Sequence, residues 1–176
     1  MRNILISSIG KRVEMIKLFQ AVISKLGVDA KVYTCNVDPD NSPACKMSDG
    51  SFAVPRLTSE DYMQVLQSIC LGNNVKIVIP TTERELPILS ANKSIFANLG
   101  ICILTPDYDF VMKCIDKHQF GDYLNRLGIK NNIPKQMNSY ETLVDTVLAT
   151  ADFAEYIVEK YLAEKINTKS SKVYNS

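Results

Sequence analysis

The sequence predicts an α/β protein built on a three-layer, Rossmann-like parallel sheet. Short apolar runs alternate with longer stretches of helical periodicity, in the order β-α-β-β-α-β-α-β-α. The apolar runs lack the polar–apolar alternation of a half-exposed strand, which is typical of strands covered on both faces. Helical stretches end in glycine at Gly27, Gly100 and Gly128. Right-handed crossovers would wind these elements into one doubly covered sheet.

The first part of the chain supplies three predicted strands and two helices. Residues 3–6 form the first apolar run, and apolar positions at helical spacing follow over 13–26. "KVYTCNV" is a second β-rich run, and "SFAVP" is a third that Pro55 ends. In "TSEDYMQVLQSIC" we expect Thr58 or Ser59 to cap a helix.

The second part repeats the alternation and then loses it. "VKIVIP" is the clearest buried strand, "ERELPILSANKSIFANLG" is helical in pattern, and "ICILTP" is a further strand. "DYDFVMKCIDKHQFGDYLNRLG" carries two helical stretches. After it, "IKNNIPKQMNS" is a connector, "YETLVDTVLAT" predicts a short helix, and the last twenty or so residues show no clean pattern.

Composition excludes several classes of protein. The net charge of +1 over 176 residues does not predict a nucleic-acid surface, and no apolar run approaches the ~20 residues that span a bilayer. The odd number of widely spaced cysteines indicates reduced thiols in a cytoplasmic protein. His118 is the only histidine, so a multi-histidine metal site is excluded, and no metal ligand is predicted.

Polar residues follow three of the predicted strands, where the ligand crevice of an open parallel sheet lies. Ser7, Ser8 and Gly10 follow the first strand, Asp38 the second, and "TTERE" the fourth. The first junction has one glycine where a dinucleotide fingerprint needs three. Its backbone N–H groups, with Lys11 and Arg12 nearby, can still bind an anion, and a simple strand-to-helix turn explains it equally well.

The other two strand ends also have ordinary structural explanations. Asp38 lies where a ribose-binding acid sits in dinucleotide enzymes, but without the glycine fingerprint an Asx-type turn is favoured for "DPD". In "TTERE", Thr81 or Thr82 can cap the next helix, and Glu85 lies three residues after Thr82, which is the spacing of a capping box. The same cluster can bind a cationic or hydroxylated ligand.

Five segments together resemble a known family. They are "LISSIGKRVEMIKLF", "CNVDPDNSPA", "VPRLTSEDYMQVLQSIC", "VIPTTERELPILS" and "CIDKHQFGDYLNRLGI". Their order and spacing over residues 1–135 are similar to the N-terminal part of ATP-grasp proteins, particularly the group like the carbamoyl-phosphate synthase large subunit. The resemblance implies a Rossmann-like pre-ATP-grasp domain over 1–130. Residues 131–176 would be a connector and a truncated or degenerate start of an ATP-grasp domain.

The resemblance also implies a chemistry. Such carboxylate–amine ligases use ATP and magnesium to form an acyl phosphate that an amine or another nucleophile attacks, and the N-terminal domain forms one wall of the cleft. A small carboxylate or amino-acid-like substrate would contact the strand-end residues Ser7, Ser8, Gly10, Arg12, Asp38, Thr82, Glu83 and Glu85. Lys117 matches a lysine that reaches toward ATP phosphates, and Lys160 would be a second one, shifted by one place.

The chain departs from the family in its last part. Residues 129–176 contain no glycine, whereas a loop that closely approaches phosphates needs one, and the later magnesium and adenine elements do not follow. We therefore expect no catalytic residue and no tight ATP binding in this chain alone. The missing ATP-grasp half, a second subunit or a second copy of the chain would be its partner.

Two alternatives stay open at this point. The chain is either a free-standing small-ligand-binding module or docking subunit, or a degenerate relic whose tail covers a sheet edge. Ordered packing of 136–176 on the sheet would favour these alternatives over an enzyme fragment. For the ligand-binding hypothesis, Arg12→Ala and Glu85→Ala should weaken binding and leave the melting temperature nearly unchanged, whereas loss of a capping box costs on the order of 1 kcal/mol.

Overall fold

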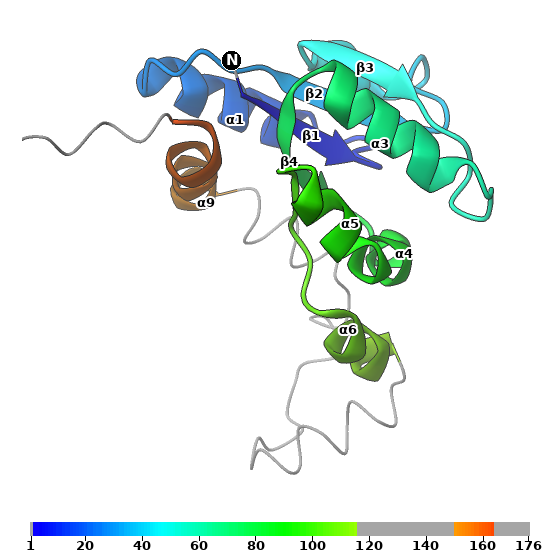
Figure 1. Cartoon of the computed structure of the whole chain (residues 1–176). Helices are drawn as coiled ribbons and strands as arrows, with labels where there is room; N and C mark the ends of the chain where they lie inside the picture. Colours follow the sequence, from blue (N-terminus) through cyan, green and yellow to red (C-terminus); the bar gives the residue numbers. More distant parts are fainter. Residues whose placement is uncertain (1, 116–149, 164–176) are drawn as a thin grey trace, which may run out of the picture.

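The computed structural model describes residues 2–115 and 150–163, and a five-stranded parallel sheet lies at its centre (Figure 1). Every pair of neighbouring strands is parallel, and the strand order is β3-β2-β1-β4-β5. The strands are β1 (Asn3–Ser7), β2 (Val32–Asn36), β3 (Gly50–Ala53), β4 (Val75–Pro80) and β5 (Cys102–Ile103). The predicted Rossmann-like α/β fold is confirmed.

The order of the strands creates a switch point beside β1. The chain runs from β1 outward through β2 and β3, then crosses to the other side of β1 to form β4 and β5. Ser7 and Pro80, the last residues of β1 and β4, are partners in the register. The helix that follows β1 packs on one face of the sheet, and the helix that follows β4 packs on the other face. The carboxyl ends of β1 and β4 therefore flank the crevice where open α/β sheets bind ligands.

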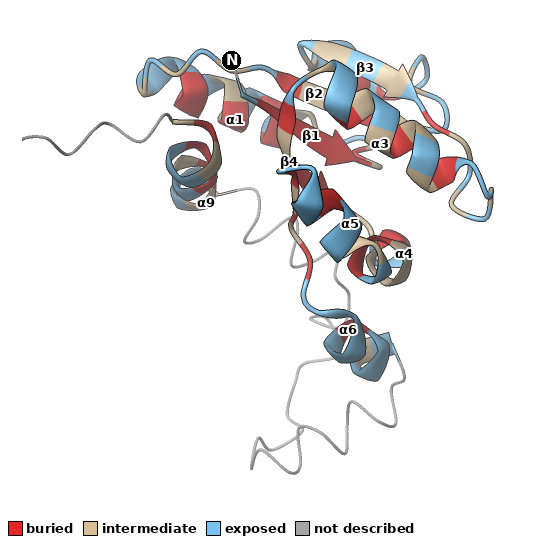
Figure 2. Cartoon of the chain, viewed as in Figure 1, coloured by how far each residue is buried: buried red, intermediate tan, exposed pale blue. Residues whose placement is uncertain are grey.

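One face of the sheet is covered by α1 (Val13–Lys25), α2 (Pro43–Met47), α9 (Ala151–Ile157) and the π-helical turn η4 (Val158–Leu162). Side chains of β1 and β4 that point to this face, such as Ile6 and Ile79, pack with Phe19 of α1. All five residues of β1 are buried, as its red ribbon in Figure 2 shows. This face is one half of the hydrophobic core.

The opposite face is covered by α3 (Tyr62–Gly72), α4 (Leu86–Ala91) and α5 (Lys93–Asn98). Leu5 and Val78 point to this face and pack with Leu66 and Phe96. A short 3₁₀ turn, η1 (Glu83–Glu85), connects β4 to α4, and α6 (Tyr108–Ile115) follows β5 and contacts α4. The result is three layers, as the sequence predicts.

Some helices differ from the sequence-based expectation. The five-residue helix α2 was not predicted; Ser42 caps it, and its oxygen accepts a hydrogen bond from the Cys45 N–H at 3.3 Å. The helix expected over 83–100 breaks at Asn92, whose side-chain amide donates to the Ile88 carbonyl at 2.8 Å. Asparagine bonds to nearby backbone in this way and so interrupts helices.

The predicted cap of α3 is wrong. The helix begins at Tyr62, its N-cap residue is Asp61, and no side chain caps it. Ser59 instead lies in the preceding turn, where its N–H donates to the Arg56 carbonyl at 2.8 Å. Thr58 and Ser59, which the sequence predicted as caps, therefore belong to the turn before α3.

Part of the tail is packed into the core. Four apolar residues of α9 and η4 are buried among side chains of α1 and the sheet: Ala154, Ile157, Val158 and Leu162. The rings of Phe153 and Phe19 meet edge to face with centroids 6.3 Å apart. The helix predicted from "YETLVDTVLAT" and the second helix predicted before Gly128 lie outside the described residues, apart from Thr150, which caps α9.

Candidate functional site at the carboxyl edge

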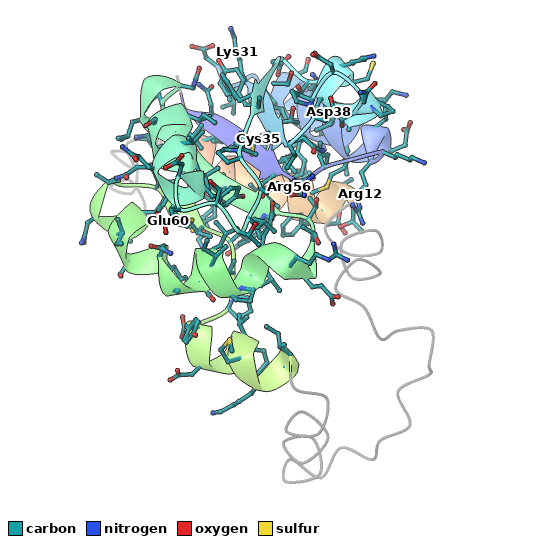
Figure 3. The ribbon with its side chains drawn as sticks, turned by 90° about the vertical axis from the view of Figure 1, so that its right-hand side faces the viewer. Arg12, Lys31, Cys35, Asp38, Arg56 and Glu60 are labelled. Atoms are coloured by element: carbon teal, nitrogen blue, oxygen red, sulfur yellow. The ribbon has the colours of Figure 1, made fainter. Side chains whose placement is uncertain are left out.

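The carboxyl edge of the sheet brings the predicted strand-end residues together. The turn after β1 holds Ser8 and Gly10, the loop after β2 holds Asp38, and the turn after β4 holds Glu83. These strands are parallel neighbours, so their carboxyl ends lie at one edge of the sheet. Figure 3 looks onto this edge, where Arg12, Asp38 and Arg56 are labelled.

Glu85 is the buried centre of this edge. Glu85 is only 1% exposed, although it is the last residue of the 3₁₀ turn η1, whose other two residues are exposed. One carboxylate oxygen accepts a hydrogen bond from the Ser7 hydroxyl at 2.7 Å. The other accepts from the Ser8 hydroxyl and, at 3.4 Å, from the Tyr62 hydroxyl. Three hydroxyl groups, from β1, the turn after it and α3, therefore converge on one carboxylate.

Burial controls the ionisation of this cluster. Desolvation raises the pKa of Glu85 above its ordinary value, and the hydrogen bonds from Ser8, Ser7 and Tyr62 lower the pKa in part. Desolvation, with the nearby Glu85 charge as the second cause, also raises the pKa of Tyr62. Burial raises the pKa of the Cys35 thiol for the same reasons. The hydroxyl and the thiol consequently stay protonated near neutral pH.

The raised pKa of Glu85 predicts a pH dependence of stability. A carboxyl group whose folded-state pKa lies above its unfolded value contributes stability that is fully present below the unfolded pKa and is lost as pH rises through the folded pKa. We therefore expect the stability of the native chain, relative to Glu85→Gln, to fall as pH rises from about 4.5 toward neutral. Urea unfolding of both proteins across this range measures it. A difference that is constant with pH, or that grows, would contradict the assignment.

The turn after β1 has an unusual backbone that its neighbours fix. Ser8 lies in the left-handed region with φ of 51°, which costs a non-glycine residue roughly 1–2 kcal/mol. Its N–H donates to the Cys35 carbonyl at 3.0 Å. The Thr81 hydroxyl donates to the carbonyls of Ser7 and Ser8 at 2.8 and 2.9 Å. Contacts with β2, Thr81 and Glu85 together hold Ser8 in this conformation.

Gly10 continues the same turn and connects it to the loop after β2. Its φ of 59° is also left-handed, which explains the glycine. The Gly10 carbonyl accepts hydrogen bonds from the Ser42 hydroxyl at 2.7 Å and from the Ala44 N–H at 3.3 Å. The same Ser42 hydroxyl oxygen caps α2. The turns after β1 and β2 thus form one hydrogen-bonded unit.

The turn also presents backbone donors. The N–H groups of Ile9, Gly10 and Lys11 donate no hydrogen bond to any residue within 2–115 or 150–163. Arg12, which is partly exposed, occupies the N-cap position of α1 without capping it. Consecutive backbone N–H groups without an internal acceptor, beside left-handed residues, are the kind of donor set that binds anions in proteins. The junction is therefore a structured turn that can also accept a carboxylate.

Other predicted residues have structural partners. The Asp38 carboxylate accepts from the backbone and side-chain N–H groups of Asn41 at 3.3 and 2.7 Å, so it stabilises its own loop as the Asx-turn interpretation expects. Thr82 caps η1, with its hydroxyl accepting from the Arg84 N–H at 3.4 Å. The capping box is wrong, because the Glu85 carboxylate bonds the hydroxyl cluster instead.

Of the two predicted ATP-binding lysines, Lys160 is the one that lies within the described residues, and it lies away from the carboxyl edge. Lys117 lies outside the described residues. Lys160 lines a cavity together with Arg2 and Lys76, which lie at the amino ends of β1 and β4. The fold thus places Lys160 near the opposite edge of the sheet from Gly10.

Sequence reasoning missed three residues that build the site. Tyr62 shares the helical spacing of the apolar residues Leu66 and Ile69, and the fold shows that its hydroxyl donates to Glu85. Thr81 and Ser42 were not expected to bond the turn after β1. Side chains of Ser, Thr and Tyr next to a strand end are a weak signal, since most such residues only cap or turn.

Two kinds of feature are absent from the described ranges. Within residues 2–115 and 150–163, no three His, Cys, Asp or Glu side chains come together as a metal site would require. Over the same ranges, no helix has the length and apolar character that crossing a bilayer demands.

A family model for the PylC-like N-terminal domain matches residues 4–104, which is more than half of the chain. The chain belongs to the PylC-like N-terminal domain family. The matched range includes β1 from Ile4 onward, the four other strands, and the segments after β1, β2 and β4 that hold the site residues. The resemblance to the N-terminal domain of ATP-grasp proteins is thereby confirmed. No curated protein sequence matches the chain.

Solved structures share the fold of this PylC-like domain. The biotin carboxylase domain of a single-chain bacterial carboxylase is 18% identical with a TM-score of 0.51, covering 73% of this chain and 29% of that one. The biotin carboxylase subunit of pyruvate carboxylase is 13% identical with a TM-score of 0.52, covering 73% and 28%. The biotin carboxylase domain dimer of Hydrogenobacter thermophilus 2-oxoglutarate carboxylase, in complex with MgADP, ADP and bicarbonate, is 13% identical with a TM-score of 0.51, covering 72% and 27%. The PylC-like domain spans less than a third of the length of these structures.

Proposed function

We propose that this PylC-like domain is the substrate-binding N-terminal domain of an ATP-grasp carboxylate–amine ligase. The observation that carries the proposal is the Glu85 cluster, which holds the turn after β1 in a left-handed conformation at the switch point of the sheet. Burying a carboxylate and holding a serine in the left-handed region both lower the free energy of unfolding. Such features concentrate at functional sites of proteins.

The residues divide into two roles. Ser7 and Glu85 are buried and bond each other, so they position the turn and do not touch the ligand. The free N–H groups of the turn and the Arg12 guanidinium would bind the substrate carboxylate, because both are donors suited to an anion. The exposed carboxylate of Glu83 and the Asp38 carboxylate would bind its amino group.

The complete enzyme would use ATP and magnesium, as the MgADP complex of the carboxylase relative suggests for that fold. The described carboxyl edge does not suit ATP phosphates by itself, since Lys160 lies at the other end of the strands. We infer that ATP is held by a further ATP-grasp part or a second subunit. The carboxyl edge of this chain alone would bind ATP weakly, and the chain alone would have no ligase activity. The narrower likeness to the carbamoyl-phosphate synthase large subunit stays a prediction.

A free-standing ligand-binding module or docking subunit is the second candidate. It is favoured by the packing of α9 and η4 on α1, because residues 150–163 then complete the core of this domain. In that case the same carboxyl edge would bind the ligand without catalysis. Ligase activity of the chain mixed with a separate ATP-grasp protein distinguishes a docking subunit from a binding module.

A melting-temperature screen with free amino acids and short carboxylic acids tests the proposal. We expect at least one of them to raise the melting temperature of the native chain. Arg12→Ala and Glu83→Gln should each lower the affinity for that ligand roughly 10-fold or more, since a charge-assisted hydrogen bond contributes about 1.5–3 kcal/mol. Lys17→Ala, on the exposed side of α1 and in an ion pair with Glu14, is the control and should bind normally. No response across the panel, or equal binding by all variants, would contradict the proposal.

A further inference from the structure

A cavity lined by cationic and apolar side chains lies at the other end of the strands from the carboxyl edge. It has a volume of about 580 Å³, and the cationic residues Arg2, Lys76, Lys93 and Lys160 line it. Arg2 precedes β1 and Lys76 lies near the start of β4, so the cavity is at the amino edge of the sheet. The two residues of β5, with Tyr161 of η4, form part of its wall. We refer to it as the basic groove.

The charges of the basic groove are poorly compensated. No acidic side chain of the described ranges lines it. Arg2 and Lys76 form no ion pair or side-chain hydrogen bond with any residue that the structure describes. Lys93 is partly neutralised, since its ammonium group lies 3.1 Å from the exposed Asp107 carboxylate and 2.8 Å from the Thr105 carbonyl. Cations gathered in one concavity repel each other and attract an anion.

Lys160 is held in place although it is exposed. Its ammonium group donates to the Tyr156 hydroxyl at 2.6 Å. It also lies 5.0 and 5.2 Å from the ring centroids of Tyr156 and Tyr161, within the range of cation–π contacts. A lysine with restricted rotamers loses less conformational entropy when it binds a ligand. Lys160 is therefore a preorganised cation at the mouth of the basic groove.

We propose that the basic groove binds a small polyvalent anion of the oligophosphate class. Its volume is in the range of small-ligand sites, roughly 300–1,000 Å³. Lysine and arginine are the usual partners of phosphate groups. A single monovalent anion would leave most of the four cations unpaired, whereas a linear oligophosphate carries a comparable number of negative charges. This site is separate from the carboxyl edge, so the two proposals stand or fall independently.

Calorimetric titration with inorganic triphosphate, at constant ionic strength, tests the basic groove. We expect saturable binding by the native chain and at least a 10-fold weaker affinity for the double variant Lys76→Gln, Lys160→Gln. Arg2→Gln alone should weaken binding several-fold, and because Arg2 is exposed this variant should fold normally. Lys46→Gln on α2 is the control, because Lys46 is exposed and lies away from the basic groove, and it should bind like the native chain.

Three results would overturn the inference. They are no saturable binding of triphosphate, equal affinity of the double variant and the native chain, and an equal loss of affinity in the Lys46→Gln control. The last result would show that triphosphate responds to the general charge of the surface. The melting temperature of each variant without ligand, compared with that of the native chain, separates a loss of binding from a loss of folding.

Discussion

Glu85→Ala is expected to lower the free energy of unfolding by about 3 kcal/mol. The substitution removes the acceptor of hydrogen bonds from Ser7, Ser8 and Tyr62 and leaves these hydroxyls buried without it. Each unsatisfied buried hydroxyl costs about 1–3 kcal/mol, and the cavity adds to this cost. The substitution also removes the free-energy cost of burying the Glu85 carboxylate, which offsets a part of the loss. The expected net loss is therefore well below the sum of the individual costs.

Glu83→Ala is the matched control for this experiment. Glu83 belongs to the same 3₁₀ turn but is exposed, so its replacement should change the free energy of unfolding by no more than about 0.5 kcal/mol. Urea unfolding at neutral pH measures both. The structure thus replaces the expectation that Glu85→Ala leaves the melting temperature unchanged. Equal stability of the two variants would show that the buried cluster is not formed.

Ile157→Ala is expected to lower the free energy of unfolding by about 2–4 kcal/mol. Ile157 of α9 is completely buried in the cluster that includes Phe19 and Ile6. Truncation of a buried isoleucine removes its transfer free energy and opens a cavity among side chains that cannot fully collapse. Urea or thermal unfolding, followed by circular dichroism, measures the loss.

Glu159→Ala in the adjacent turn provides the comparison. Glu159 is exposed, and its replacement should have an effect within about 0.5 kcal/mol. If Ile157→Ala is as stable as this control, residues 150–163 are not part of the folded core, and the free-standing module loses its main support. A large loss for Ile157→Ala alone would show that this segment completes the Rossmann-like domain.

The layout of the sheet could be predicted because its strands are continuous apolar runs. "VKIVIP" and the run over 3–6 are buried on both faces, and few other structures accommodate such runs. Local details were harder. The helix α2 has only five residues and starts with Pro43, so its sequence resembles a loop. The break at Asn92 depends on one side-chain bond that periodicity does not register.

The sequence predicted the location of the site but not the contacts of its side chains. The rule for strand ends correctly located the turns after β1, β2 and β4 on one edge. It did not predict which side chains are buried, because the hydrogen bond between Ser7 and Glu85 joins residues that are 78 positions apart. Local spacing instead suggested a capping box for Glu85. The position of Lys160 was equally out of reach, since it depends on how α9 packs on α1.

The most direct test of the carboxyl edge is a two-dimensional NMR titration of the ¹⁵N-labelled native chain with the amino acid or carboxylic acid that most raises its melting temperature. We predict that the amide resonances of residues 8–12, 36–41 and 82–85 shift together with one saturation curve, and that Arg12→Ala weakens the response. Shifts confined to residues around Arg2, Lys76 and Lys160, or scattered over the surface without saturation, would contradict a ligand site at the end of β1.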